Sequence, residues 1–108
     1  MPHADLKYSP DLTFDPQAIF TAIEHTILAH DSGSGDCKCR SYPAEASNHT
    51  HLLIEISMLS KPHRDEAFTL RLRDAIAAAV KCHLKQSCYI SLAITYSDAM
   101  YLTDRNDI

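Results

Sequence analysis

The sequence predicts an α/β protein built from two consecutive β-α-β units, with one four-stranded sheet and two helices on one face. Short segments with alternating polar and apolar residues indicate four strands, and two segments with helical periodicity lie between them. The polar stretch 47–50 separates the halves, which cover residues 2–48 and 51–98. The strand–helix–strand order favours parallel pairing within each half, so we expect a single domain over residues 1–108.

In the first half, residues 3–8 alternate as a half-buried strand does, and the Ser9-Pro10 step ends it. Asp15-Pro16 is typical of a helix start, with an N-cap carboxylate followed by proline at the first helical position. Helical periodicity continues to His30. After a loop that contains both glycines of the chain, residues 37–45 form the second predicted strand.

The second half repeats this order. A strand is predicted over residues 51–59, with Leu52, Ile54, Ile56 and Met58 on its inner face. The longest helix is predicted over residues 64–85, with Phe68, Leu72, Ile76 and Ala79 on its apolar stripe. The fourth strand is predicted over residues 89–96. Such a sheet leaves one face uncovered, which favours packing against another subunit.

The composition excludes several classes of protein. Of the 108 residues, 45% are hydrophobic and 22% are charged, as in an ordinary globular domain. The formal net charge of −4 argues against nucleic-acid binding. No apolar run reaches the roughly 20 residues that span a bilayer, and no signal-peptide core is present. We therefore expect a cytoplasmic protein with no membrane partner and with four free cysteines.

The start of the chain, Met1-Pro2-His3, carries the main candidate for catalysis. Removal of an initiator methionine before a small residue leaves Pro2 with a free secondary amine. An α-amino group has a pKa of about 7.7–8.0, so modest tuning makes it a base near neutral pH. On this interpretation Pro2 is a general base at the head of a strand.

A terminal proline that begins a duplicated β-α-β chain resembles the tautomerase superfamily, and within it the 5-carboxymethyl-2-hydroxymuconate isomerase family. The resemblance covers nearly the whole chain. The segments that carry it are Met1-Pro2-His3, Cys39-Arg40-Ser41, Arg64, Lys81-Cys82-His83-Leu84, Ser91-Leu92-Ala93-Ile94 and the region near Asn106.

The resemblance implies a homotrimer that needs no cofactor and isomerises an unsaturated 2-hydroxy di- or tricarboxylic acid in the catabolism of aromatic compounds. Pro2 would be the catalytic base, and Arg40 and Arg64 would bind the carboxylates of the small-molecule substrate. This assignment is chemically sound because arginine pairs bidentately with carboxylates and stabilises a developing dienolate. Without the resemblance, Arg40 is better interpreted as a solvated or salt-bridged residue. Arg64 is equally well interpreted as a surface residue at the helix start, where its charge opposes the helix dipole and thereby favours a functional role.

Two alternatives come from other classes of protein. The first is a trimeric protein that keeps the fold and has no turnover. The second is a metal-binding protein, because Cys37, Cys39, His49 and His51 form two i, i+2 pairs. On a strand the two members of such a pair share a face, so that they can bind one ion.

Overall fold

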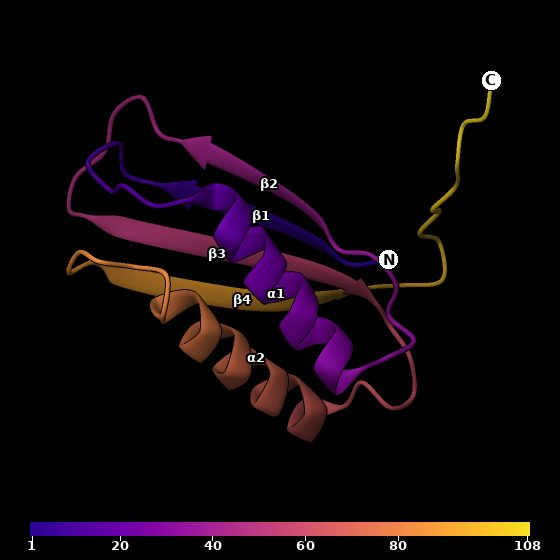
Figure 1. Ribbon diagram of the computed structural model, residues 1–108. Helices are drawn as coiled ribbons and strands as arrows, with labels where there is room; N and C mark the ends of the chain where they lie inside the picture. The colour runs from indigo at the N-terminus through magenta and orange to yellow at the C-terminus, as the bar shows by residue number, and fades with distance from the viewer.

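The computed structural model describes residues 1–108 and contains four strands and two helices in the order β-α-β-β-α-β (Figure 1). In chain order they are β1 (His3–Tyr8), α1 (Pro16–His30), β2 (Lys38–Pro43), β3 (His51–Leu59), α2 (Glu66–Lys81) and β4 (Tyr89–Ser97). The predicted fold class and element order are confirmed. Neither helix is long and apolar enough to cross a membrane.

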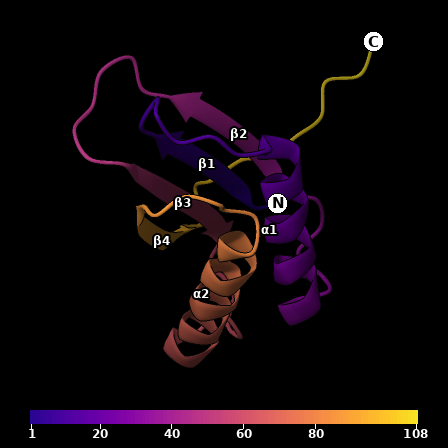
Figure 2. The same cartoon turned by 60° about the vertical axis from the view of Figure 1, so that its left-hand side comes forward.

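The four strands form one mixed sheet in the order β2-β1-β3-β4. Each half supplies a parallel pair, β1 with β2 and β3 with β4, and the two halves meet through the antiparallel pairing of β1 with β3. Both helices lie on the same face of the sheet, as Figure 2 shows. The other face is not covered by any element of the chain.

The α1 boundaries follow from its local chemistry. Asp15 is the N-cap and its Oδ1 accepts a hydrogen bond of 3.1 Å from the backbone N–H of Gln17. Pro16 fills the first helical position, where no backbone donor is needed. Ile19, Ile23 and Ile27 are buried against the sheet, so the prediction for this helix is confirmed.

The second helix is shorter than the predicted 64–85. Its N-cap is Asp65, whose carboxylate accepts a 2.9 Å hydrogen bond from the N–H of Phe68, and this leaves Arg64 outside the helix. At the other end, His83 and Leu84 donate to carbonyls three residues back, which closes tight turns instead of extending the α-helix. The buried stripe ends on Val80, whereas Ala79 is only half-buried.

The second strand is also shorter than the predicted 37–45. The backbone N–H of Cys37 donates to Glu24 Oε2 at 2.9 Å, so it is not available to the sheet. At the C-terminal end of β2, the last hydrogen bond to β1 is the one from Ala44 N–H to Tyr8 O. Because β1 ends at Tyr8, the residues after Ala44 have no partner strand. The first and third strands match their predicted bounds, and β4 is one residue longer.

Alternation along the central strands separates the core from the uncovered face. The predicted inner residues of β3 are each no more than 1% exposed, and Ala4 and Leu6 of β1 are fully buried beside them. His3, Asp5 and Lys7 therefore point to the uncovered face.

Truncation of the core should be costly. Ile54→Ala removes a fully buried side chain next to Leu6, its partner in the register, and we expect a loss of about 2–5 kcal/mol in the free energy of unfolding. Urea denaturation measures this. Leu70→Ala, at a position 41% exposed on α2, is the matched control and should change stability by less than about 1 kcal/mol. Equal losses in the two variants would contradict the assignment of the core.

Candidate active site

Pro2 lies directly before β1, and its side chain is buried. Its carbonyl accepts a 2.9 Å hydrogen bond from the N–H of Lys38, which extends the β1–β2 pairing by one step. Pro2 alternates with Ala4 and Leu6, so it lies on the helix side of the sheet. The sequence-predicted base thus lies buried immediately before a central strand.

In the full chain, Met1 covers this position. Its Sδ is 3.6 Å from Lys38 Nζ, and its side chain packs beside Gly35. The peptide bond to Met1 makes the Pro2 nitrogen an amide, whose lone pair is delocalised and does not accept a proton near neutral pH. Base chemistry at Pro2 therefore requires that Met1 be absent.

Arg40 lies on β2 opposite Asp5, on the uncovered face of the sheet. Its Nε and Nη2 contact Asp5 Oδ1 at 2.9 and 2.8 Å, and its Nη1 lies 3.1 Å from His3 Nδ1. Partial burial, followed by the Arg40 charge, holds the pKa of His3 below its usual value. His3 is therefore neutral at pH 7, and the Arg40 guanidinium, 43% exposed, is paired on this face with the Asp5 carboxylate.

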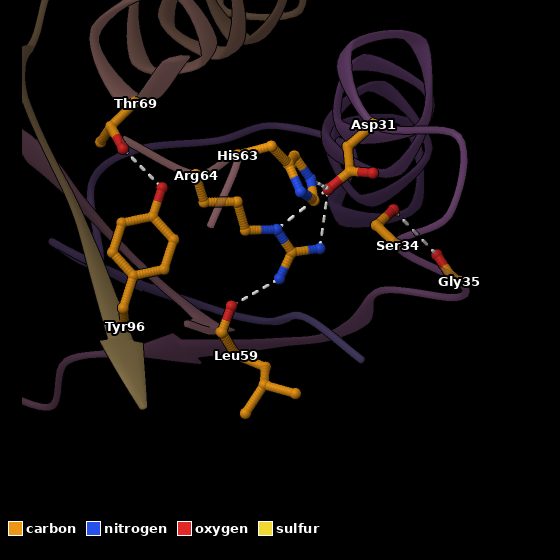
Figure 3. Close-up of polar contacts among 8 residues, drawn as sticks. All are labelled: Asp31, Ser34, Gly35, Leu59, His63, Arg64, Thr69 and Tyr96. Atoms are coloured by element: carbon orange, nitrogen blue, oxygen red, sulfur yellow. Dashed lines mark hydrogen bonds and ion pairs between the residues drawn. The ribbon is translucent and has the colours of Figure 1, made fainter. Parts of the chain in front are cut away.

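Arg64 has a different environment, because its side chain is only 3% exposed. Its Nε and Nη2 contact Asp31 Oδ2 at 2.9 and 2.8 Å, and its Nη1 donates to the carbonyl of Leu59 at 2.6 Å (Figure 3). His63 Nε2 lies 2.9 Å from the same oxygen of Asp31. The interpretation of Arg64 as a surface residue is therefore wrong.

Asp31 is the residue that organises this cluster, and the sequence interpretation did not select it. It follows α1 as its C-cap and is 9% exposed. Although burial favours the neutral acid, hydrogen bonds from His63 and Arg64 hold the pKa of Asp31 below its usual value. One signal in the sequence pointed to it, since an acidic residue at a helix C-terminus is disfavoured by the helix dipole and needs a cationic partner.

The sheet register decides which predicted residues come together. His3 pairs with Ser57, so β3 ends at the edge of the sheet where Pro2 precedes β1. The Leu59–Arg64 contact lies at this same end. Pro2 and the Arg64 cluster are both on the helix side, whereas Arg40 extends on the uncovered side. The three residues share one end of the sheet and are divided between its two faces.

The predicted metal site is not formed. Cys37 and Cys39 lie level with the start of β1, whereas His51 precedes Leu52, the partner of Tyr8 at the end of β1. A six-residue strand spans roughly 20 Å, so the two pairs cannot share an ion. No group of three or more His, Cys, Asp or Glu side chains is arranged to hold a metal.

The uncovered face has a small hollow beside Arg40. Its volume is about 200 Å³, and its lining includes His3 and Asp5 of β1, Glu55 and Ser57 of β3, and Thr95 of β4. Typical small-molecule sites have about 300–1,000 Å³. The hollow on this face of a single chain is therefore smaller than such sites.

Several solved structures have the same fold, and the similarity extends over nearly the whole chain. A 5-carboxymethyl-2-hydroxymuconate delta-isomerase is 20% identical, with a TM-score of 0.70 over 99% of this chain and 88% of that one. A 5-carboxymethyl-2-hydroxymuconate isomerase from Deinococcus radiodurans R1 is 19% identical, with a TM-score of 0.69 over 98% and 90%. A fused 4-OT wild-type symmetric trimer is 12% identical, with a TM-score of 0.73 over 95% and 93%.

No family model matches the sequence, and no curated protein matches it. The likeness is therefore one of structure, and it extends to both β-α-β units. The chain has the tautomerase fold that its sequence predicted.

The Asp31–Arg64 pair should be important for stability. Asp31→Asn leaves the buried guanidinium without its counter-charge, and removal of one partner from a buried pair costs about 3–5 kcal/mol. Urea denaturation at pH 7 measures the loss. The matched control is Asp74→Asn, which breaks the exposed pair with Arg73 and should cost no more than about 1 kcal/mol. If Asp31→Asn lowers the free energy of unfolding by no more than the control does, the buried pair does not stabilise the fold.

The Asp31–Arg64 pair should also make the free energy of unfolding depend on pH in the acidic range. A carboxyl group with a lowered pKa in the folded state contributes stability above its unfolded pKa of about 3.9, and this contribution is lost as the pH falls through the folded pKa. The stability difference between the native chain and Asp31→Asn should therefore be full at pH 7 and shrink below pH 4. A difference that stays constant down to acid unfolding would be inconsistent with this linkage.

Proposed function

We propose that this protein is a cofactor-free isomerase of the tautomerase type, with Pro2 as the general base after Met1 is removed. The observation that carries the proposal is the place of Pro2 at the head of a central strand, where it is buried on the helix side of the sheet. The fold is similar to that of a 5-carboxymethyl-2-hydroxymuconate delta-isomerase. The proposed substrate is an unsaturated 2-hydroxy di- or tricarboxylic acid of that kind, formed in the breakdown of aromatic compounds.

The surroundings of Pro2 support a base that is neutral at pH 7. Burial disfavours the charged ammonium form, so it lowers the pKa of an amine. The free amine would take the proton of the substrate's 2-hydroxyl group and return it to a distant carbon of the dienol, giving the 2-oxo isomer.

Arg40 is the proposed partner for a substrate carboxylate or for the negative charge of the dienolate. Its guanidinium is partly exposed, and the neutral His3 beside it adds no competing charge. Arginine in such a position stabilises charge that develops in the transition state. Asp5 fixes the orientation of the guanidinium, because its Oδ1 contacts both Nε and Nη2 of Arg40.

Arg64 can bind a substrate only through the guanidinium N–H groups that Asp31 and Leu59 do not engage. A guanidinium has five N–H groups, and Asp31 and Leu59 occupy one on each nitrogen. The two remaining N–H groups are the proposed contacts for a second carboxylate. In this arrangement, Asp31 holds Arg64 in a fixed position at the end of the sheet where Pro2 lies.

A homotrimer would complete the site. The uncovered sheet face and the small hollow beside Arg40 support a neighbour that supplies the rest of the cavity. The fused 4-OT protein of the same fold is a symmetric trimer. In this assembly an arginine of one chain would serve the Pro2 of another.

The activity test combines an assay with a mass measurement. Intact mass establishes whether Met1 is absent, and absorbance then follows turnover of 5-carboxymethyl-2-hydroxymuconate. We expect Pro2→Ala to lower kcat by about 10²-fold or more with the oligomeric state unchanged, because the positioned base is lost. Arg40→Ala and Arg64→Ala should raise KM, lower kcat, or both. The exposed variant Asp74→Asn is the control and should keep full activity.

Unchanged turnover in Pro2→Ala would overturn the mechanism. A second candidate function, a trimeric protein of this fold without turnover, is favoured by one observation. Asp31 and Leu59 engage the buried Arg64 as a structural link. Absence of turnover in protein shown by mass to begin at Pro2, across 2-hydroxymuconate-type substrates, would favour this second function.

A further inference from the structure

Two thiols face each other in a groove at the edge of the sheet. Cys37 and Cys39 lie at the start of β2, which is an edge strand, and their sulfurs are 3.7 Å apart. The groove between β2 and α1 has a volume of about 530 Å³, and both cysteines line it together with Gln17, Phe20, Thr21, Glu24, Lys38 and Arg40. Neither thiol has a role in the proposed isomerisation.

The two thiols have different environments. Cys37 is buried, and Cys39, which is half-buried, lines the groove beside it. The hydrogen bond between the two thiols lowers the pKa of Cys39 and raises that of Cys37. In such a pair the less buried sulfur, Cys39, is the attacking thiol, and the more buried sulfur, Cys37, is the resolving thiol.

The backbone allows the sulfurs to come closer. A disulfide requires about 2.05 Å between sulfurs, so the pair must close from 3.7 Å. Cys37 precedes the first residue of β2, and its N–H is bound by the Glu24 side chain instead of by a neighbouring strand. Its position is therefore not fixed by the sheet, and it follows Gly35, whose φ of 77° forms the preceding turn.

The size of the groove indicates the kind of ligand. Glu24 lines the groove, whereas the side chains of Lys38 and Arg40 alternate with the two cysteines and extend toward the uncovered face. A volume of about 530 Å³ is within the usual range for small-molecule sites, so a small disulfide fits its size.

We propose that Cys37 and Cys39 form a thiol–disulfide exchange site for small-molecule disulfides such as oxidised glutathione. The Cys39 thiolate attacks one sulfur of the disulfide RSSR, the S–S bond breaks, and RS⁻ leaves and takes a proton. Cys37 then loses its proton and attacks the Cys39 sulfur, which expels the second RS⁻ as RSH. The two cysteines are oxidised to a disulfide, and one RSSR is reduced to two RSH.

Oxidised glutathione and intact mass spectrometry test the site. The parent is the full chain with Cys82→Ser and Cys88→Ser, which removes the two thiols outside the groove. The reduced parent should lose two hydrogens and retain no glutathione. Trypsin cuts after Lys38, so the new disulfide should join two peptides under non-reducing conditions.

Two further variants separate the roles of the thiols. Cys37→Ser in the parent should retain one glutathione on Cys39, because the resolving sulfur is missing. Cys39→Ser should react at least about tenfold more slowly, because the buried thiol is poorly accessible. Circular dichroism checks the fold of each variant. If Cys37→Ser does not fold, the parent and Cys39→Ser still decide the proposal.

Two results would overturn the exchange site. One is a parent that stays reduced at a glutathione concentration that modifies Cys82 in the native chain. The other is a parent that retains glutathione without closing to the disulfide. These readouts do not involve isomerase activity, so they are independent of the proposed function.

Discussion

The antiparallel pairing of β1 with β3 is the contact on which the rest of the structure depends, because it joins the two halves into one sheet. Its register places Leu6 opposite Ile54 and Ala4 opposite Ile56, all of them buried beneath the helices. A shift of one residue would turn these side chains to the uncovered face. The hydrophobic cost of such a shift fixes the register, and the register in turn fixes where the functional residues lie.

The second long-range link is made of charges. Asp31 follows α1, Arg64 precedes α2, and the guanidinium also binds the carbonyl that ends β3. No side-chain nitrogen or oxygen in the buried interior lacks a hydrogen-bond partner. A buried charge is tolerated only when it is paired and hydrogen-bonded in this way. The pair connects three chain segments at the end of the sheet that holds Pro2, so stability and the proposed chemistry share residues there.

Strand β2 combines two chemistries through the alternation of a strand. Arg40 extends toward the uncovered face, where it meets Asp5 and His3, while Cys37 and Cys39 turn toward α1. Because β2 lies at the edge of the sheet, the groove along it is reached from outside. The carbonyl of Pro2 is hydrogen-bonded to Lys38, between the two cysteines. The proposed base and the thiol pair are therefore direct neighbours in the sheet.

The sequence by itself determined the order of the elements, the caps of α1 and the inward face of β3, because alternation, helical spacing and capping act over a few residues. It also singled out Pro2, Arg40 and Arg64 through a resemblance that the shared fold supports. The tertiary structure alone decided that Arg64 is buried on Asp31, that the cysteine and histidine pairs lie at opposite ends of the sheet, and that Glu24 keeps Cys37 out of β2. These outcomes depend on sheet register and on contacts between residues far apart in the chain, which local patterns do not encode.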